Sequence, residues 1–210
     1  MENFIKYGSF RLIAEHISWI LLNINLVVVN WGFSVILLTI IIKVALLPLS
    51  YMSYNSLLKL QKKQPELNSV IKKQTKNIAI KDLTKLYTKQ STNPIKCCLP
   101  IFIQTPIFIS LYCTLNKSIE FKRAPFVLWI TDLSLMDPYF LLPIIMGLSI
   151  FFQQKINNKV NKVNNINKIL PVFVTLFFLW FPSFLLLYWI TNNLINAIQH
   201  SLIKKYYEEQ

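Results

Sequence analysis

A lysine lies inside an apolar run that otherwise has the length and composition of a membrane span. The run covers residues 31–49, and Lys43 carries its only charge. A cation near the middle of a lipid-spanning helix costs about 2.5–3.5 kcal/mol on insertion scales. Thr39 lies one turn earlier on the same helical face, which Gly32 and Ser50 extend. We therefore expect this face to contact protein or water, with Lys43 as a cation in a wet cavity. Snorkelling of Lys43 to the headgroups is the alternative.

Two further polar features occur at membrane depth. In the last apolar run Tyr188, Asn192, Asn196 and Gln199 recur at helical spacing, with Trp189 and Asn193 beside them, and Gln104 lies between two prolines. Hydrogen bonds between helices, worth about 0.6 kcal/mol each, are an alternative reading for the asparagines. Three inward polar faces predict a hydrophilic groove. The candidate groove residues are Lys43, Thr39, Gln104, Tyr188, Trp189 and Asn192.

The sequence does not favour covalent chemistry. It contains no Ser/His/Asp spacing, phosphate-binding loop or zinc-protease motif, and its three cysteines are not accompanied by a histidine cluster. No carboxylate lies in any predicted span, which argues against a proton relay or a cation-coupled transporter. We therefore expect no catalytic residue, no cofactor and no metal.

Apolar segments recur along the chain and predict a multi-pass membrane protein. The 210 residues are 54% hydrophobic, and the mean hydropathy is +0.44. We predict an all-α fold with five transmembrane helices around a cytoplasm-open groove, at residues 31–49, 100–115, 139–153, 169–181 and 184–203. The second span is predicted to break at Pro106. The fourth measures only about 20 Å as a helix against a hydrocarbon core of about 30 Å, which predicts membrane thinning or a re-entrant turn at Pro182.

The charge distribution predicts the orientation of these spans. Residues 51–96 hold ten lysines and two acidic residues, and residues 155–168 hold four lysines and no acid. The positive-inside rule places both segments in the cytoplasm, so the N-terminus is outside and the C-terminus is cytoplasmic. We divide the chain into an external amphipathic segment (1–30), a core (31–203) that includes a cytoplasmic helical hairpin (51–96), and a short cytoplasmic tail (204–210).

Short motifs spread along the chain resemble those of one known family, the bacterial YidC membrane protein insertases. They occur in order between about Trp19 and Ile203 and comprise Asn30–Ser34, Pro48-Leu49, Leu86-Tyr87, Asn93-Pro94, Pro100, Gln104–Phe108, Ala124–Ile130, Asp132–Ser134, Asp137–Tyr139 and Phe177–Ser183. These residues are similar to the conserved core of the family. The additional N-terminal span and large periplasmic domain of Gram-negative relatives are not matched.

The resemblance implies both a fold and a function. The fold is a five-helix core with an external amphipathic helix and a cytoplasmic hairpin. The function is insertion of membrane proteins into the bacterial inner membrane, alone or beside the Sec translocon. The family's basic groove residue falls on Lys43, and its substrate-contacting positions fall on Thr39 and Tyr188-Trp189. The implied partners are nascent membrane-protein clients and membrane lipids, with the Sec translocon and the ribosome as candidates and no specific nucleic-acid sequence.

Two other classes of function compete with this one. A small-solute channel or transporter needs a continuous pore, whereas the polar stripes favour the cytoplasmic half of the spans. A structural subunit of a membrane complex predicts an uncharged, well-packed helix interface, which Lys43 fits poorly.

Overall fold

The protein is all-α. The computed structural model describes residues 11–59, 94–117, 123–157 and 165–208. Its labelled elements are α1 (Arg11–Val28), α2 (Trp31–Ala45), α5 (Pro94–Lys117), α6 (Leu141–Asn157), α7 (Asn165–Phe177), the 3-10 helix η4 (Phe178–Trp180) and α8 (Ser183–Glu208). A further helix covers Leu47–Lys59. In the described ranges extended pairing is limited to one isolated bridge between Met136 and Pro182.

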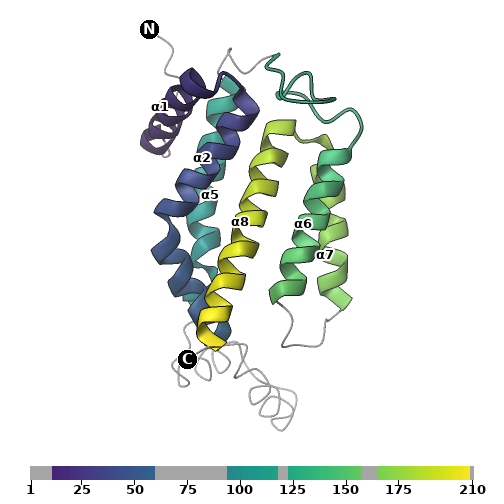
Figure 1. Ribbon diagram of the computed structural model, residues 1–210. Coiled ribbons are helices and arrows are strands. Elements are labelled where there is room, and N and C mark those ends of the chain that lie inside the picture. The colour runs from purple at the N-terminus through teal and green to yellow at the C-terminus, as the bar shows by residue number, and fades with distance from the viewer. Residues whose placement is uncertain (1–10, 60–93, 118–122, 158–164, 209–210) are drawn as a thin grey trace.

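Helix α8 is the central element of the bundle (Figure 1). It packs against α2 on one side and α6 on the other, while α7 packs on α6. Helix α1 packs against α2 and α5 at the end of the molecule near the N-terminus. The first turns of α8 supply the largest block of the core, Phe184 to Tyr188, and these five side chains are almost completely buried. The start of α8 is therefore fixed in the bundle, and the polar residues that follow it are held in register.

Helix α2 begins at a well-formed cap and ends in a bend. Asn30 accepts hydrogen bonds from the backbone N–H groups of Gly32 (3.0 Å) and Phe33 (3.2 Å), which satisfies two of the donors left free at a helix start. After Ala45 the chain turns by 67° into the helix over Leu47–Lys59. Pro48 lies just after the bend. It has no backbone N–H and cannot donate a hydrogen bond to a carbonyl of the preceding turn, which accounts for the break. The predicted span over residues 31–49 is thus two helices rather than one.

Helix α5 corrects one prediction. It is helical from Pro94 to Lys117 without interruption, so the predicted break at Pro106 is wrong. A proline in a helix interior removes one backbone hydrogen bond and crowds the carbonyl four residues earlier, at about 3 kcal/mol. The rest of the hydrogen-bond ladder and the packing of α5 against α1 offset that cost.

The segment between α5 and α6 ties the ends of the helices together. Leu135 accepts hydrogen bonds at its carbonyl from both the N–H and the hydroxyl of Ser183, each at 2.8 Å. Asp137 is fully buried and accepts from the backbone N–H of Leu142 at 2.6 Å and from the indole N–H of Trp129 at 2.9 Å. A carboxylate at a helix N-terminus is favoured both by these donors and by the helix dipole. This segment therefore fixes the starts of α6 and α8 relative to one another.

Helices α6 and α7 approach closely because of a glycine. A Cβ atom at Gly147 would lie 1.9 Å from the Thr175 hydroxyl oxygen, so no larger residue fits without displacement. Helix α7 has 13 residues and passes directly into the turn of η4, and α8 starts after Pro182. The end of the fourth apolar run at Pro182 is as predicted.

The outer faces of the bundle are apolar. Exposed side chains include Ile41 and Val44 on α2, Phe152 on α6, Phe173 on α7 and Ile198 on α8, all between 46% and 62% exposed. Within the described residues no single helix has both the length and the apolar composition of a membrane span, but α2 and the helix over Leu47–Lys59 satisfy both criteria as a bent pair. The five-span arrangement stays a prediction.

Part of the predicted domain plan lies outside the described residues. Of the predicted hairpin at 51–96, residues 60–93 are not described, and the same holds for 1–10 and 209–210 at the termini. Residues 51–59 continue the helix that follows the bend.

Candidate functional site

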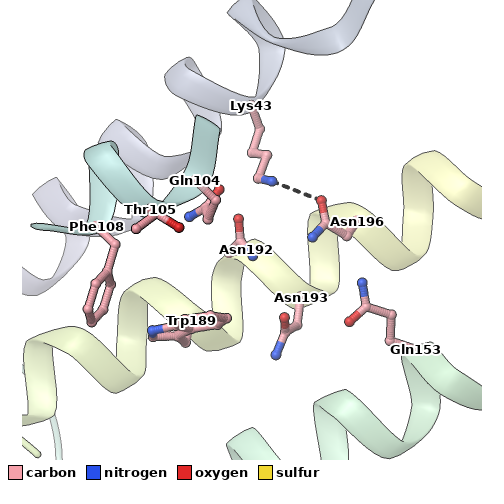
Figure 2. Close-up of a pocket in the computed structure, with 9 residues that line it drawn as sticks. All are labelled: Lys43, Gln104, Thr105, Phe108, Gln153, Trp189, Asn192, Asn193 and Asn196. Carbon is pink, nitrogen blue, oxygen red and sulfur yellow. Dashed lines mark hydrogen bonds between the residues drawn. The ribbon is translucent and has the colours of Figure 1, made fainter. Parts of the chain in front are cut away.

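Lys43 is almost completely enclosed by protein. Its side chain is 6% exposed, and its ammonium group donates a 2.9 Å hydrogen bond to the carboxamide oxygen of Asn196 on α8. The bond crosses from α2 to α8, two helices that pack against each other. Snorkelling would place the ammonium in the headgroup layer, but here it points across the bundle to α8 (Figure 2).

A cavity of about 260 Å³ begins at Lys43 and runs along α8 (Figure 2). Four helices contribute to its wall, which is made of Lys43 from α2, Gln104, Thr105 and Phe108 from α5, Gln153 from α6, and Trp189, Asn192, Asn193 and Asn196 from α8. A second cavity, of about 20 Å³, is lined by Lys43, Leu46, Leu49, Ser50, Ile103 and Gln104. Lys43 and Gln104 thus line both cavities.

The wall of the larger cavity has an unusual chemical composition. Five of its nine side chains are carboxamides, one is a cation, and none is a carboxylate. A carboxamide offers two N–H donors and an acceptor oxygen with no net charge. The positive charge of Lys43 is therefore not neutralised by any residue in this wall.

Contacts between α5 and α8 hold one side of the cavity. The Gln104 side-chain N–H donates a short hydrogen bond to the Tyr188 hydroxyl. The rings of Phe108 and Trp189 meet edge to face with centroids 5.8 Å apart, an arrangement that aromatic quadrupoles favour. These two contacts, one polar and one aromatic, position α5 across from α8.

The asparagines of α8 are held differently from one another. Asn193 donates to the Ser149 hydroxyl on α6 at 3.0 Å. Asn196 accepts from Lys43 through its side chain, and its backbone carbonyl accepts from the Tyr54 hydroxyl at 3.2 Å. The side-chain oxygen of Asn192, by contrast, is buried and has no hydrogen-bond partner among the described residues.

The structure brings together four of the six residues predicted for the groove. Lys43, Gln104, Trp189 and Asn192 all line the cavity. Thr39 and Tyr188 are not part of its wall. Thr39 is 1% exposed and donates its hydroxyl hydrogen to the Val35 carbonyl at 2.7 Å, within its own helix.

The cavity also contains residues that sequence reasoning did not select. These are Thr105, Phe108 and Gln153. Gln153 ends the third predicted span. A glutamine at the end of an apolar run could have indicated a residue of the groove. Thr105 and Phe108 belong to the motif Gln104–Phe108 of the family resemblance. Phe108 was not selected for the groove, because an aromatic residue in an apolar helix is ordinarily part of the core.

The described residues also indicate what the cavity is not. They contain no group of three or more His, Cys, Asp or Glu side chains that could hold a metal ion. The wall of the cavity combines hydrogen-bonding carboxamides, two aromatic rings and one basic group, Lys43.

Comparison with known proteins identifies the family. The family described as "60Kd inner membrane protein" matches residues 23–210, nearly the whole chain. The chain belongs to the 60Kd inner membrane protein family. Proteins of this family are inner-membrane proteins, which agrees with the apolar outer faces of the bundle.

Individual relatives of this chain are named as membrane protein insertases. The chain is 42% identical over 209 residues to the membrane protein insertase YidC of Stutzerimonas stutzeri strain A1501, and 42% identical over 212 residues to that of Francisella tularensis subsp. novicida strain U112. These matches cover 97% and 99% of this chain but 37% and 38% of the relatives. The chain thus spans less than two fifths of the length of these relatives.

A solved structure has the same fold. A crystal structure of an active YidC insertase with its first transmembrane domain superposes with a TM-score of 0.71 at 25% sequence identity, covering 91% of this chain and 46% of that one. The all-α architecture and the resemblance to YidC insertases that the sequence predicted are therefore confirmed.

Proposed function

We propose that this chain is a membrane protein insertase, which moves hydrophobic segments of nascent proteins into the inner membrane. Support comes from relatives named as YidC insertases, each aligned over almost all of this chain. The observation that carries the proposal is a cavity lined by carboxamides and one lysine, inside a bundle whose outer faces are apolar. The clients are nascent membrane proteins, with the Sec translocon and the ribosome as candidate partners.

The physical task of an insertase is to move a client's polar tail past hydrocarbon. Transfer of one unpaired amide from water to an alkane costs about 4–8 kcal/mol, whereas transfer to a solvent that can hydrogen-bond costs about 0.5–2 kcal/mol. The side chains of Gln104, Gln153 and Asn193 provide such a hydrogen-bonding surface inside the bundle. We infer that the groove lowers the free-energy cost of moving each amide out of water from the value for an alkane to the value for a hydrogen-bonding solvent.

Lys43 adds an electrostatic contribution to this surface. Unit charges about 4 Å apart attract by roughly 1 kcal/mol in water and roughly 4 kcal/mol at an effective dielectric of 20. Because no carboxylate in the cavity wall neutralises Lys43, an acidic client tail is drawn toward it. A lysine attracts as a point charge and does not need the bidentate geometry of an arginine.

We propose the following placement in the membrane. Five spans surround a groove that opens to the cytoplasm, with the N-terminus outside and the C-terminus in the cytoplasm. The exposed apolar residues of α6 and α7, such as Phe152 and Phe173, face lipid. Helix α7, 13 residues long, is about 20 Å and shorter than a hydrocarbon core of about 30 Å, so the bilayer thins beside it. Thinning shortens the path of the polar tail.

Reconstitution into liposomes tests the function directly. A synthetic single-span client is added from outside, and the protected fraction is followed by protease digestion. The chain should raise the initial rate of insertion over protein-free liposomes while leaving a trapped small dye inside. Release of the dye without faster insertion would instead indicate a solute channel.

Labelling tests the orientation. In a cysteine-free background, single cysteines at Ser118 and Asn165 should react with an impermeant reagent from opposite sides of the membrane, with position 118 outside. Reaction of both from the same side would contradict the five-span arrangement.

A further inference from the structure

Asn192 carries an unsatisfied acceptor at the wall of the groove. Its side chain is 3% exposed, and its carboxamide oxygen has no hydrogen-bond partner among the described residues. A buried polar atom without a partner ordinarily carries a free-energy penalty, and such atoms are few in native proteins. Of the seven such atoms among the described residues, two belong to this wall, the carboxamide oxygen of Asn192 and the indole nitrogen of Trp189. Their position in a cavity wall points to a ligand that supplies a donor to Asn192.

Lys43 supplies the complementary group nearby. Its ammonium has three N–H donors, and the hydrogen bond to Asn196 uses one of them. In Figure 2 the oxygen of Asn192 lies on the side of its carboxamide that is turned toward Lys43 and Gln104. Both residues line the same stretch of groove. The Asn192 oxygen is itself enclosed, so a ligand reaches it only when the side chain rotates toward the cavity.

The pair selects between chemical classes of ligand. A carboxylate accepts but cannot donate, so it would satisfy Lys43 and leave Asn192 unpaired. A peptide group has one acceptor oxygen and one donor N–H and can satisfy both. The peptide groups of an unfolded polar tail are unpaired and need such partners once they leave water.

We propose that Lys43 and Asn192 bind the main chain of the client's polar tail, in addition to any acidic side chain. The peptide N–H donates to the Asn192 oxygen, and a peptide carbonyl accepts from the Lys43 ammonium. This inference rests on the proposed insertase function and deepens it. Because every residue except proline carries both groups, the groove accepts tails of different sequence.

The test removes the client's N–H groups without changing charge. Two synthetic single-span clients carry a polar tail of either glycine or N-methylglycine, which has no N–H. Each is inserted into liposomes that hold the parent chain, the Asn192→Leu variant or no protein, and the protein-free rates correct for spontaneous insertion. Leucine has the same branched arrangement of side-chain heavy atoms as asparagine and removes the acceptor.

We expect the effects of the two changes, N-methylation of the tail and substitution of Asn192, not to add. With the glycine tail, Asn192→Leu should insert about fivefold more slowly than the parent, as for one lost hydrogen bond. With the N-methylglycine tail, the parent should already be slowed by about the same factor, and Asn192→Leu should add nothing. If Asn192→Leu does not fold, Asn192→Ser, whose shorter side chain withdraws the acceptor, should give the same pattern.

Three outcomes are distinguishable. Equal slowing of both clients by Asn192→Leu would overturn the inference and assign Asn192 to packing or to a bound water. An unchanged rate with the glycine tail would overturn it as well. No insertion of any client by the parent chain would instead refute the proposed function.

Discussion

Replacing Lys43 by glutamate should invert the preference of the groove for the charge of a client's tail. Lys43 is 6% exposed and its ammonium reaches the cavity wall on α8, so a glutamate there would place a carboxylate in the same space. Attraction of an acidic tail would become repulsion. The variants Lys43→Arg, which keeps the charge, and Lys43→Met, which keeps the length alone, are matched controls.

The size of the effect follows from the surroundings of the lysine. The interaction at about 4 Å lies between roughly 1 kcal/mol in water and roughly 4 kcal/mol at an effective dielectric of 20. The cavity is open enough for water, which screens the charge, so we take an interaction energy of about 1–2 kcal/mol. Each 1.36 kcal/mol changes a rate tenfold, so Lys43→Met should slow a client with an aspartate in its tail by about 5–30-fold. Lys43→Glu should slow it further.

The assay compares three clients that differ at one tail position, with aspartate, asparagine or lysine there. Initial rates in liposomes are measured for each variant and each client. Lys43→Arg should behave as the parent. In Lys43→Met the asparagine client should slow only by about fivefold, as for one lost hydrogen bond to its main chain, and the aspartate client should slow by the Coulomb contribution in addition. Slowing of all three clients by the same factor would refute the electrostatic role and leave Lys43 with main-chain binding or packing alone.

Two packing features give predictions about stability. A Cβ atom at Gly32 would lie 2.0 Å from a ring carbon of Phe126, so Gly32→Ala should lower stability by about 1–3 kcal/mol; thermal unfolding in detergent measures the loss, and Phe126→Leu in the same chain should restore part of it. Asp137→Asn keeps the shape but removes the charge that caps α6 and binds Trp129, so it should cost about 1–2 kcal/mol; an unchanged unfolding temperature together with unchanged tryptophan fluorescence would contradict this assignment.

The sequence predicted those parts of the molecule in which one residue type strongly limits the environment. A lysine in an apolar run must avoid lipid, and Lys43 is enclosed by protein as that cost requires. Pro182 cannot continue a helical hydrogen-bond ladder, and the fourth apolar run ends there. Carboxamides at helical spacing on the last run predicted a polar face, and Asn192, Asn193 and Asn196 all line the cavity.

Other features depend on tertiary packing that sequence patterns do not contain. Pro106 was predicted to break a helix, but neighbouring contacts keep α5 continuous. The bend after Ala45 was not predicted, although Pro48 was visible. Thr39 shares the face of Lys43, yet its hydroxyl is used within its own helix. Which side chains of a polar face reach a cavity is decided by where the partner helix lies, and this applies equally to Phe108 and Gln153.

The scarcity of charge in the groove wall has a consequence for turnover. Tight binding of a client lowers the free energy of the bound state and so slows its release. Binding that is equally strong before and during the crossing does not raise the rate of crossing. A wall of several arginines would hold a tail firmly and release it slowly. Carboxamides such as Gln104, Gln153 and Asn193 exchange hydrogen bonds with a tail at little net gain over water. If the chain has the proposed function, the carboxamides of the groove provide a passage with low affinity, and release of the inserted client need not become the slow step.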